Sequence, residues 1–122
     1  MRFINAAADL EVARLHPALV PVVQAILSAC RAAGWPVEIR ALGGFRTEAQ
    51  QAALYAQGRT APGRIVTYVQ HSKHQDGLAF DLDLTGYPRE AGMALWRFLG
   101  GWWMSLGGRW GGTWRDFSHF EL

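Results

Sequence analysis

The sequence predicts a single α+β domain in which about three helices pack on a small antiparallel sheet. Apolar residues recur at helical spacing over residues 17–33, 47–58 and 90–106. They alternate with polar residues over 37–42 and 78–84, as expected of strands with one buried face. Helices and strands do not alternate regularly, which favours an antiparallel sheet. Neither a linker nor a repeat divides the 122 residues, so one domain over residues 1–122 is expected.

The first expected helix and strand have clear boundaries. Pro17 suits the first turn of a helix, and Gly34 followed by Pro36 ends it. The helix therefore covers residues 17–33. Val-Glu-Ile-Arg-Ala-Leu at 37–42 alternates apolar and polar side chains and predicts a half-buried strand.

The remaining elements follow from similar signals. Thr47 is a suitable N-cap for a second helix that ends at Gly58. Residues 65–69 are rich in β-branched side chains and predict another strand. A third helix is expected over 90–106, although it contains a Gly-Gly pair. The last strands are expected at residues 110 and 117–122.

Composition excludes several classes of protein. The formal net charge is +2 and the arginines are scattered, so no nucleic-acid surface is predicted. No apolar run approaches the length of a membrane span. Asn5 and Asp9 interrupt the N-terminal stretch, which is unlike a secretory signal, so we expect a cytoplasmic protein in the producing cell. Cys30, the sole cysteine, cannot form an intramolecular disulfide and is expected to be a buried thiol.

Two histidines and an aspartate suggest a metal site. Asp76-Gly77 is a strong turn signal between His74 and Asp81, and it would allow the two side chains to approach each other. His119 would arrive from the last strand. Each residue alone has an ordinary structural explanation, because most histidines bind no metal. Three protein ligands with an open fourth position are nevertheless typical of hydrolytic zinc.

The motifs around these residues resemble a known family. They read SxHxxGxAxD at residues 72–81 and DxxHFE at 116–121. Together they resemble the zinc peptidases of the D-alanyl-D-alanine carboxypeptidase and dipeptidase superfamily (peptidase family M15). The chain is most similar to the compact L-alanyl-D-glutamate endopeptidases of phage endolysins and bacterial wall hydrolases. Segments 44–51, 54–60, 62–67 and 110–112 extend the resemblance, which implies the Hedgehog/DD-peptidase-like fold.

The resemblance implies a role for each matched residue. One Zn²⁺ ion would be bound by His74, Asp81 and His119. Asp116 would act as general base and acid, and Arg46 would stabilise the oxyanion or anchor the substrate. Contacts with the substrate are expected from Ser72, Gln50 and Trp114.

Two further expectations concern the surroundings of the metal. A metal-bound histidine usually donates its second ring N–H to a carboxylate or carbonyl, and Asp83 and Glu121 are candidates for this contact. His71 stands where glycine is frequent in the family. Its spacing to Asp81 breaks the motif, so we expect that His71 is not a ligand.

The leading functional interpretation is a zinc endopeptidase of the peptidoglycan stem peptide, with the L-Ala–D-Glu bond as its target. Three alternatives stay open: a D-alanyl-D-alanine carboxypeptidase or dipeptidase, a catalytically silent zinc-containing wall-binding module, and a serine hydrolase using Ser72 or Ser118. A cytosolic monomer without a separate wall-binding module fits an endolysin. Such an enzyme would reach the wall after a partner, such as a holin, permeabilises the membrane.

Overall fold

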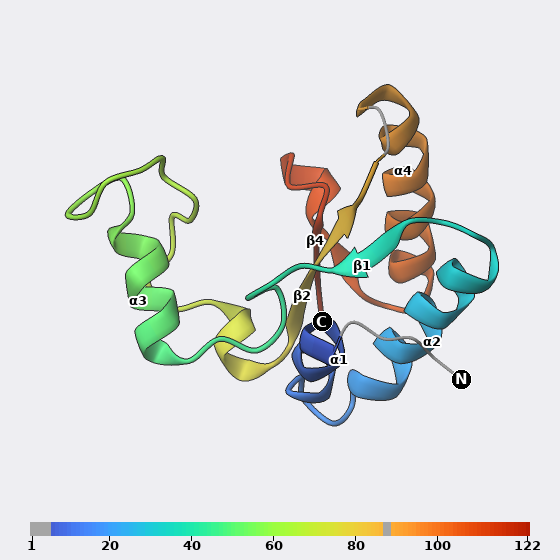
Figure 1. The fold of residues 1–122 in the computed structure, drawn as a ribbon, viewed down its shortest axis with the longest axis horizontal. Coiled ribbons are helices and arrows are strands. Elements are labelled where there is room, and N and C mark those ends of the chain that lie inside the picture. The colour runs from blue at the N-terminus through green and yellow to red at the C-terminus, as the bar shows by residue number, and fades with distance from the viewer. Residues whose placement is uncertain (1–5, 87–88) are drawn as a thin grey trace.

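The computed structural model describes residues 6–86 and 89–122, which form a four-stranded antiparallel sheet with helices packed on it (Figure 1). The helices are α1 (Ala6–Ala13), α2 (Val20–Ala32), α3 (Glu48–Ala56) and α4 (Arg89–Ser105). The strands are β1 (Val37–Ile39), β2 (Ala79–Leu84), β3 (Arg109–Trp110) and β4 (His119–Glu121), in the order β1-β2-β4-β3. Two short 3₁₀ helices are η1 (Lys73–Asp76) and η2 (Gly111–Trp114). The α+β prediction is confirmed.

The register of β2 and β4 separates a core face from a polar face. Phe80 is paired with Phe120, and the two rings stack with their centroids 5.2 Å apart. Both rings are almost completely buried. The next pair in the register is Asp81 with His119. Because adjacent residues of a strand point to opposite faces, this pair lies on the face away from the aromatic core.

The helices divide into a packed group and an outlying one. Helices α1 and α2 contact each other and β1, whereas α4 packs along β3. Trp103 of α4 meets Phe80 edge to face, and its indole N–H donates to the Glu121 carbonyl. Helix α3 lies apart from this group, on the other side of β2 (Figure 1). The core thus supports β2 and β4 from the side opposite their polar face.

The Gly-Gly pair does not interrupt α4. At Gly100 the indole of Trp110 packs directly on the helix, and an added Cβ would lie 2.1 Å from Trp110 Cδ2. Gly101 meets no such neighbour. The modest cost of glycine in a helix is therefore offset at Gly100 by close packing against β3.

The local structure differs from the predictions in several places. Helix α1 was not predicted, since its alanine-rich sequence shows little periodicity; Ala8 and Val12 bury it against the core. The predicted strand 37–42 ends at Ile39, and the predicted helix 17–33 starts only at Val20. The predicted signal-free N terminus falls partly on residues 1–5, outside the described residues. Among the helices described, none is long and apolar enough to cross a membrane.

The predicted strand at 65–69 is wrong. Two of its carbonyl groups accept hydrogen bonds from side chains of α3 and of the residues that follow this helix, and not from a neighbouring strand. Gln51 donates to the Val69 carbonyl and Arg59 donates to the Thr67 carbonyl. The β-branched side chains are largely exposed, and Tyr68 is 81% exposed. Residues 65–69 form an irregular segment beside α3.

Candidate metal centre

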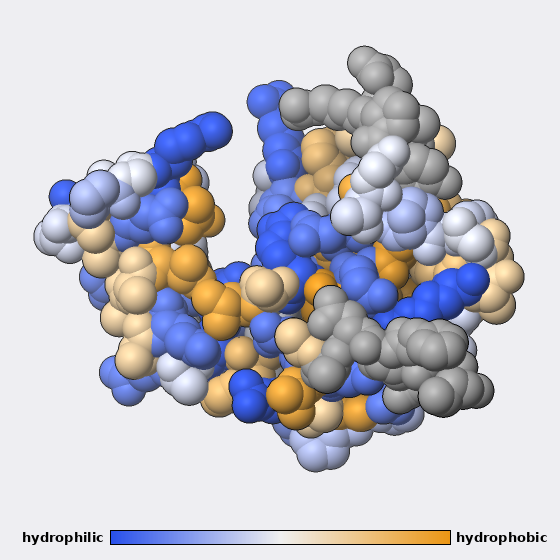
Figure 2. All heavy atoms as spheres, in the orientation of Figure 1, coloured by the Kyte–Doolittle hydropathy of each residue, from blue (hydrophilic) through white to orange (hydrophobic). Residues whose placement is uncertain are grey.

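A deep cleft separates α3 and the segment that follows it from the polar face of the sheet. Its volume is about 880 Å³, and Figure 2 shows it as a notch in the molecular surface. His74, Asp81 and His119 lie on its floor, and Arg46 and Asp116 also line it. The residues expected to carry the chemistry therefore share one cavity.

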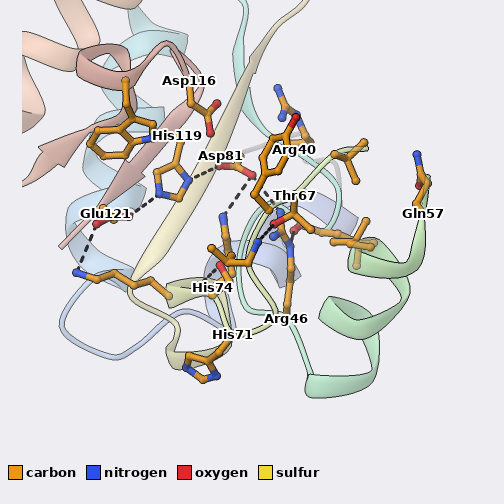
Figure 3. Close-up of a pocket in the computed structure, with 18 of the residues that line it drawn as sticks. Arg40, Arg46, Gln57, Thr67, His71, His74, Asp81, Asp116, His119 and Glu121 are labelled. Carbon is orange, nitrogen blue, oxygen red and sulfur yellow. Dashed lines mark hydrogen bonds and ion pairs between the residues drawn. The ribbon is translucent and has the colours of Figure 1, made fainter. Parts of the chain in front are cut away.

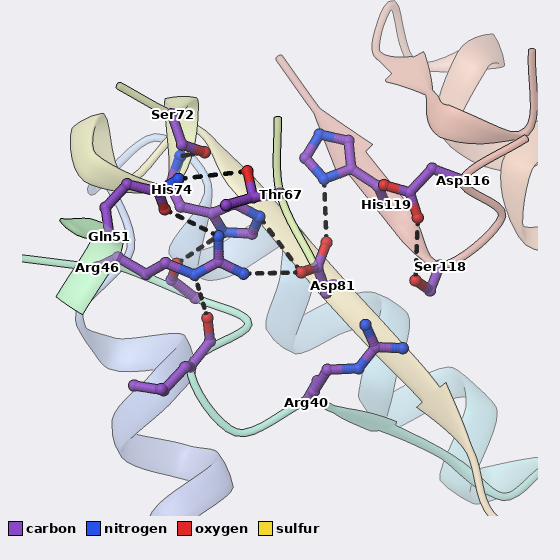
Figure 4. Close-up of polar contacts among 12 residues, drawn as sticks. Arg40, Arg46, Gln51, Thr67, Ser72, His74, Asp81, Asp116, Ser118 and His119 are labelled. Atoms are coloured by element: carbon purple, nitrogen blue, oxygen red, sulfur yellow. Dashed lines mark hydrogen bonds and ion pairs between the residues drawn. The ribbon is translucent and has the colours of Figure 1, made fainter. Parts of the chain in front are cut away.

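The structure brings the three predicted ligands together. His74 lies on η1, Asp81 on β2 and His119 on β4. Nε2 of His74 is 3.3 Å from Asp81 Oδ2, and Nδ1 of His119 is 3.0 Å from Asp81 Oδ1 (Figure 4). One donor atom from each residue lies within 4.8 Å of the others.

Local sequence explains how His74 reaches this position. Ser72 caps η1 by accepting a hydrogen bond from the His74 backbone N–H, while the Gln75 side chain accepts one from the Ser72 N–H. Gly77 ends η1 in the left-handed region at φ 71°. A Cβ at Gly77 would lie 2.6 Å from the backbone nitrogen of His16, so a side chain would displace the connection between α1 and α2. The predicted turn at Asp76-Gly77 is thus confirmed.

Hydrogen bonds select one nitrogen of each imidazole for a metal. Nδ1–H of His74 donates to the Gly44 carbonyl at 2.9 Å, which leaves Nε2 as the ring nitrogen that faces Asp81. Nε2–H of His119 donates to Glu121 Oε1 at 2.8 Å, which leaves Nδ1 toward Asp81 (Figure 3). Glu121 therefore contacts a predicted ligand as expected. Asp83 instead pairs with Arg40 at 2.8 Å.

The donor set fits a catalytic divalent metal. Two imidazole nitrogens and one carboxylate oxygen are a known combination for zinc with an open fourth position. Among the described residues, the cluster contains three side chains that could hold a metal ion. His74 is only 2% exposed, and Asp81 is also buried. The hydrogen bonds to Gly44 and Glu121 hold the imidazoles in place from the side away from Asp81.

The contacts within the cluster lower the pKa of Asp81 and raise the pKa of His119. Burial alone would raise the pKa of Asp81, but hydrogen bonds from His119 and His74 outweigh it and hold that pKa well below its usual range. Burial likewise opposes the charged form of His119, yet hydrogen bonds to Asp81 and Glu121 raise the His119 pKa. A metal competes with a proton for Nδ1 of His119, so metal binding weakens as the pH falls.

Arg46 is fixed beside the cluster by three different acceptors. Its Nε–H donates to the Leu42 carbonyl, Nη1 to Gln51 Oε1 and Nη2 to Asp81 Oδ2. Burial lowers the pKa of Arg46, and the neighbouring Asp81 carboxylate counteracts this effect. A guanidinium group has five N–H donors, so each terminal nitrogen of Arg46 retains one for a further acceptor.

Asp116 and Trp114 come from the opposite wall. Asp116 follows η2, and its carboxylate lies near His119 with only a long contact of 3.4 Å to Ser118 Oγ (Figures 3 and 4). The Trp114 ring is 6.1 Å from the His119 ring, and Trp114 is 43% exposed to the cleft. Asp116 is thus a carboxylate available to solvent and ligands.

Other predicted residues are placed differently. Gln50 completes the capping box of α3 with Thr47 and is not among the described residues that line the cleft. Its neighbour Gln51, which was not predicted, is fully buried and holds Arg46. The spacing of Thr47 and Gln50 already signals a capping box, and this signal could have redirected the prediction to Gln51. His71 is exposed, pairs with Asp76 and lies outside the cluster, as expected.

Removing the carboxylate behind His119 should weaken metal binding. In Glu121→Ala we expect the zinc affinity to fall about 10–100-fold, because His119 loses the acceptor that orients its ring. Glu121→Gln, which keeps an acceptor, should lose less. The measurement is competition of the metal-free protein with a zinc chelator of known affinity. Glu38→Ala, a carboxylate of β1 that pairs with Arg31 outside the cleft, is the matched control and should leave the affinity unchanged.

The chain is similar to known proteins in sequence and in fold. No model of a protein family matches it. The peptidoglycan L-alanyl-D-glutamate endopeptidase CwlK of Bacillus subtilis (strain 168) is 33% identical, over 97% of this chain and 80% of the relative. The crystal structure of the Serratia marcescens L-Ala D-Glu endopeptidase ChiX matches with a TM-score of 0.61 and 23% identity, over 98% of this chain and 88% of that one. The second likeness concerns the fold.

Proposed function

The chain belongs to the family of peptidoglycan L-alanyl-D-glutamate endopeptidases, and on this premise we propose that it is a zinc enzyme that hydrolyses the L-Ala–D-Glu bond of the stem peptide. The observation that carries this proposal is the convergence of His74, Asp81 and His119 on the floor of a cleft that also contains Asp116. The cleft is open to the molecular surface (Figure 2).

His74 Nε2, an oxygen of Asp81 and His119 Nδ1 would hold the metal. When bound there, zinc lowers the pKa of a water molecule toward about 7 and polarises the carbonyl of the scissile bond. Gly44 and Glu121 keep the two imidazoles in the required tautomers through their hydrogen bonds. Because these contacts fix the orientation of both rings, the ligands need little rearrangement.

Asp116 and Arg46 would serve the chemical step from two sides. Asp116, as general base, takes the proton of the attacking water and transfers it to the leaving amine of D-Glu. Arg46 offers its remaining N–H groups to the carbonyl oxygen as negative charge develops there. Its rigid attachment to Leu42, Gln51 and Asp81 supports this role, since a donor that is already oriented needs no reorganisation.

Two further side chains would contact the substrate. Trp114 offers an exposed ring at the cleft beside His119. Ser72 also lines the cleft, although its hydroxyl caps η1 and therefore supports His74 as well. Gln50 is not proposed as a contact, because its side chain is used within α3.

The biological setting is proposed from the resemblance of the motifs to phage enzymes. We propose a monomeric endolysin that accumulates in the cytosol, degrades the cell wall during bacteriolysis and depends on a holin for release. Coexpression with and without a holin, followed by measurement of culture turbidity, tests this dependence. Lysis at the same time in both cultures would contradict it.

Digestion of purified sacculi tests the proposed reaction. The expected products are stem peptides with a new N-terminal D-Glu, identified by mass spectrometry, and their release should stop with a chelator and resume when zinc is restored. Free D-Ala without stem-peptide cleavage would favour a carboxypeptidase or dipeptidase. Zinc-dependent binding to sacculi without any product would favour the silent module, and activity that survives complete zinc removal would favour the serine hydrolase.

A further inference from the structure

The two walls of the cleft differ in chemistry. Leu54 of α3, together with Val66 and Val69 of the following segment, forms an apolar wall. The opposite wall carries charged residues, including Arg115 and Asp116. Figure 2 shows apolar side chains on the α3 side of the notch and hydrophilic side chains across from them. A bound peptide would therefore meet the two walls with different groups.

Most cations of the cleft already have partners. Arg46 is bound by Leu42, Gln51 and Asp81, as described above. Arg40 pairs with Asp83, and Lys73 pairs with Glu121 and donates to the Leu122 carbonyl. These groups offset acidic residues of the protein itself.

Arg115 is different from these cations. Its side chain lines the cleft, and it makes no hydrogen bond or ion pair with any other residue that the structure describes. Its backbone has φ 69°, a left-handed conformation that is uncommon for a residue with a side chain. Such conformations persist where the surrounding structure imposes them, and they are concentrated at functional sites. Its neighbours in the chain, Trp114 and Asp116, also line the cleft.

The proposed substrate presents a matching charge. Glutamate has two carboxyl groups, and when one of them continues the peptide the other remains free. The nitrogen of the same residue is the leaving group of the reaction and would receive its proton from Asp116. The free carboxylate is therefore only a few bonds away from the leaving nitrogen, which would lie beside Asp116. The adjacent residue in the chain is Arg115.

We propose that Arg115 is a specificity-determining residue that binds the free carboxylate of the D-glutamyl residue on the leaving side of the scissile bond; this inference rests on the proposed function. An anionic group entering this wall would be repelled by Asp116. A cation without a protein partner at the same wall compensates for that repulsion. A planar guanidinium can also bind a carboxylate through two parallel hydrogen bonds.

The test compares two synthetic stem peptides with each of four zinc-loaded proteins. One peptide contains L-Ala–D-Glu with a free carboxylate, and the other is identical except that this carboxylate is amidated. The proteins are the wild type, Arg115→Gln, Arg115→Lys and Arg97→Gln. Arg97 is an exposed arginine of α4 outside the cleft and supplies the matched control. Zinc content and far-ultraviolet circular dichroism verify that each variant is folded and loaded.

We expect the wild type and Arg97→Gln to prefer the free carboxylate by about 10-fold or more in kcat/KM, as for a hydrogen bond to a charged group. Arg115→Gln should lose this preference because it cleaves the carboxylate peptide more slowly and the amidated peptide at the wild-type rate. Arg115→Lys should retain part of the preference. Equal cleavage of both peptides by the wild type, or an equal loss on both in Arg115→Gln, would overturn the inference while leaving the proposed function intact. Failure of the wild type to cleave either peptide would contradict both.

Discussion

His74→Ala is expected to abolish stem-peptide hydrolysis, with kcat/KM falling by more than about 10³-fold, because a catalytic metal contributes several kcal/mol to transition-state stabilisation. His74 is buried at the cleft floor, and its Nε2 faces Asp81. Among the described histidines, only His119 also belongs to this cluster, so no other histidine replaces the lost ligand. Zinc content by mass spectrometry and digestion of sacculi should both fall.

His71→Ala is the matched control for this prediction. His71 also lines the cleft and lies three residues away, but its side chain is 68% exposed and pairs with Asp76. Its removal should leave zinc content and hydrolysis close to those of the wild type. A His74→Ala protein that keeps both zinc and activity, or a His71→Ala protein that loses them, would contradict the assigned ligand set.

Asp116→Asn should retain zinc and lose catalysis. We expect kcat to fall about 10²–10⁴-fold, the usual contribution of a positioned general base. Asparagine preserves the shape of the side chain but cannot take a proton from water. The metal ligands should be unaffected, since the contacts that hold His74 and His119 come from Gly44 and Glu121. Steady-state kinetics on a stem peptide and zinc titration of the metal-free protein check the two halves of this prediction.

Ser118→Ala separates the base role of Asp116 from a structural role. Ser118 provides the one side-chain hydrogen bond to the Asp116 carboxylate among the described residues, at 3.4 Å. Its loss should change kcat only slightly if the carboxylate acts on water. A large loss in Ser118→Ala with little effect in Asp116→Asn would remove Asp116 from the base role.

Local signals in the sequence predicted the elements that carry the site. The alternation over 78–84 predicted β2, and Asp76-Gly77 predicted the turn that allows His74 and Asp81 to meet. Thr47 predicted the start of α3. These features depend on interactions between residues close in sequence, so the sequence pattern contains them.

Predictions failed where distant residues decide the structure. The segment 65–69 has the composition of a strand, yet Gln51 and Arg59 satisfy its carbonyls and leave it irregular. Helix α1 has little periodicity and forms because the core covers Ala8 and Val12. The capping-box spacing assigns Gln50 to the start of α3, but only the fold shows that Gln51 is buried and holds Arg46.

By itself the sequence determined the family motifs, the three candidate ligands and the turn between two of them, because these are set by residue type and short spacing. Only the tertiary structure decided which imidazole nitrogen faces Asp81, since Gly44 and Glu121 select it. The tertiary structure also left Arg115 without a protein partner in the cleft, while Arg40, Arg46 and Lys73 found theirs. Such pairings depend on where packed elements place charges relative to one another, which short sequence patterns do not specify.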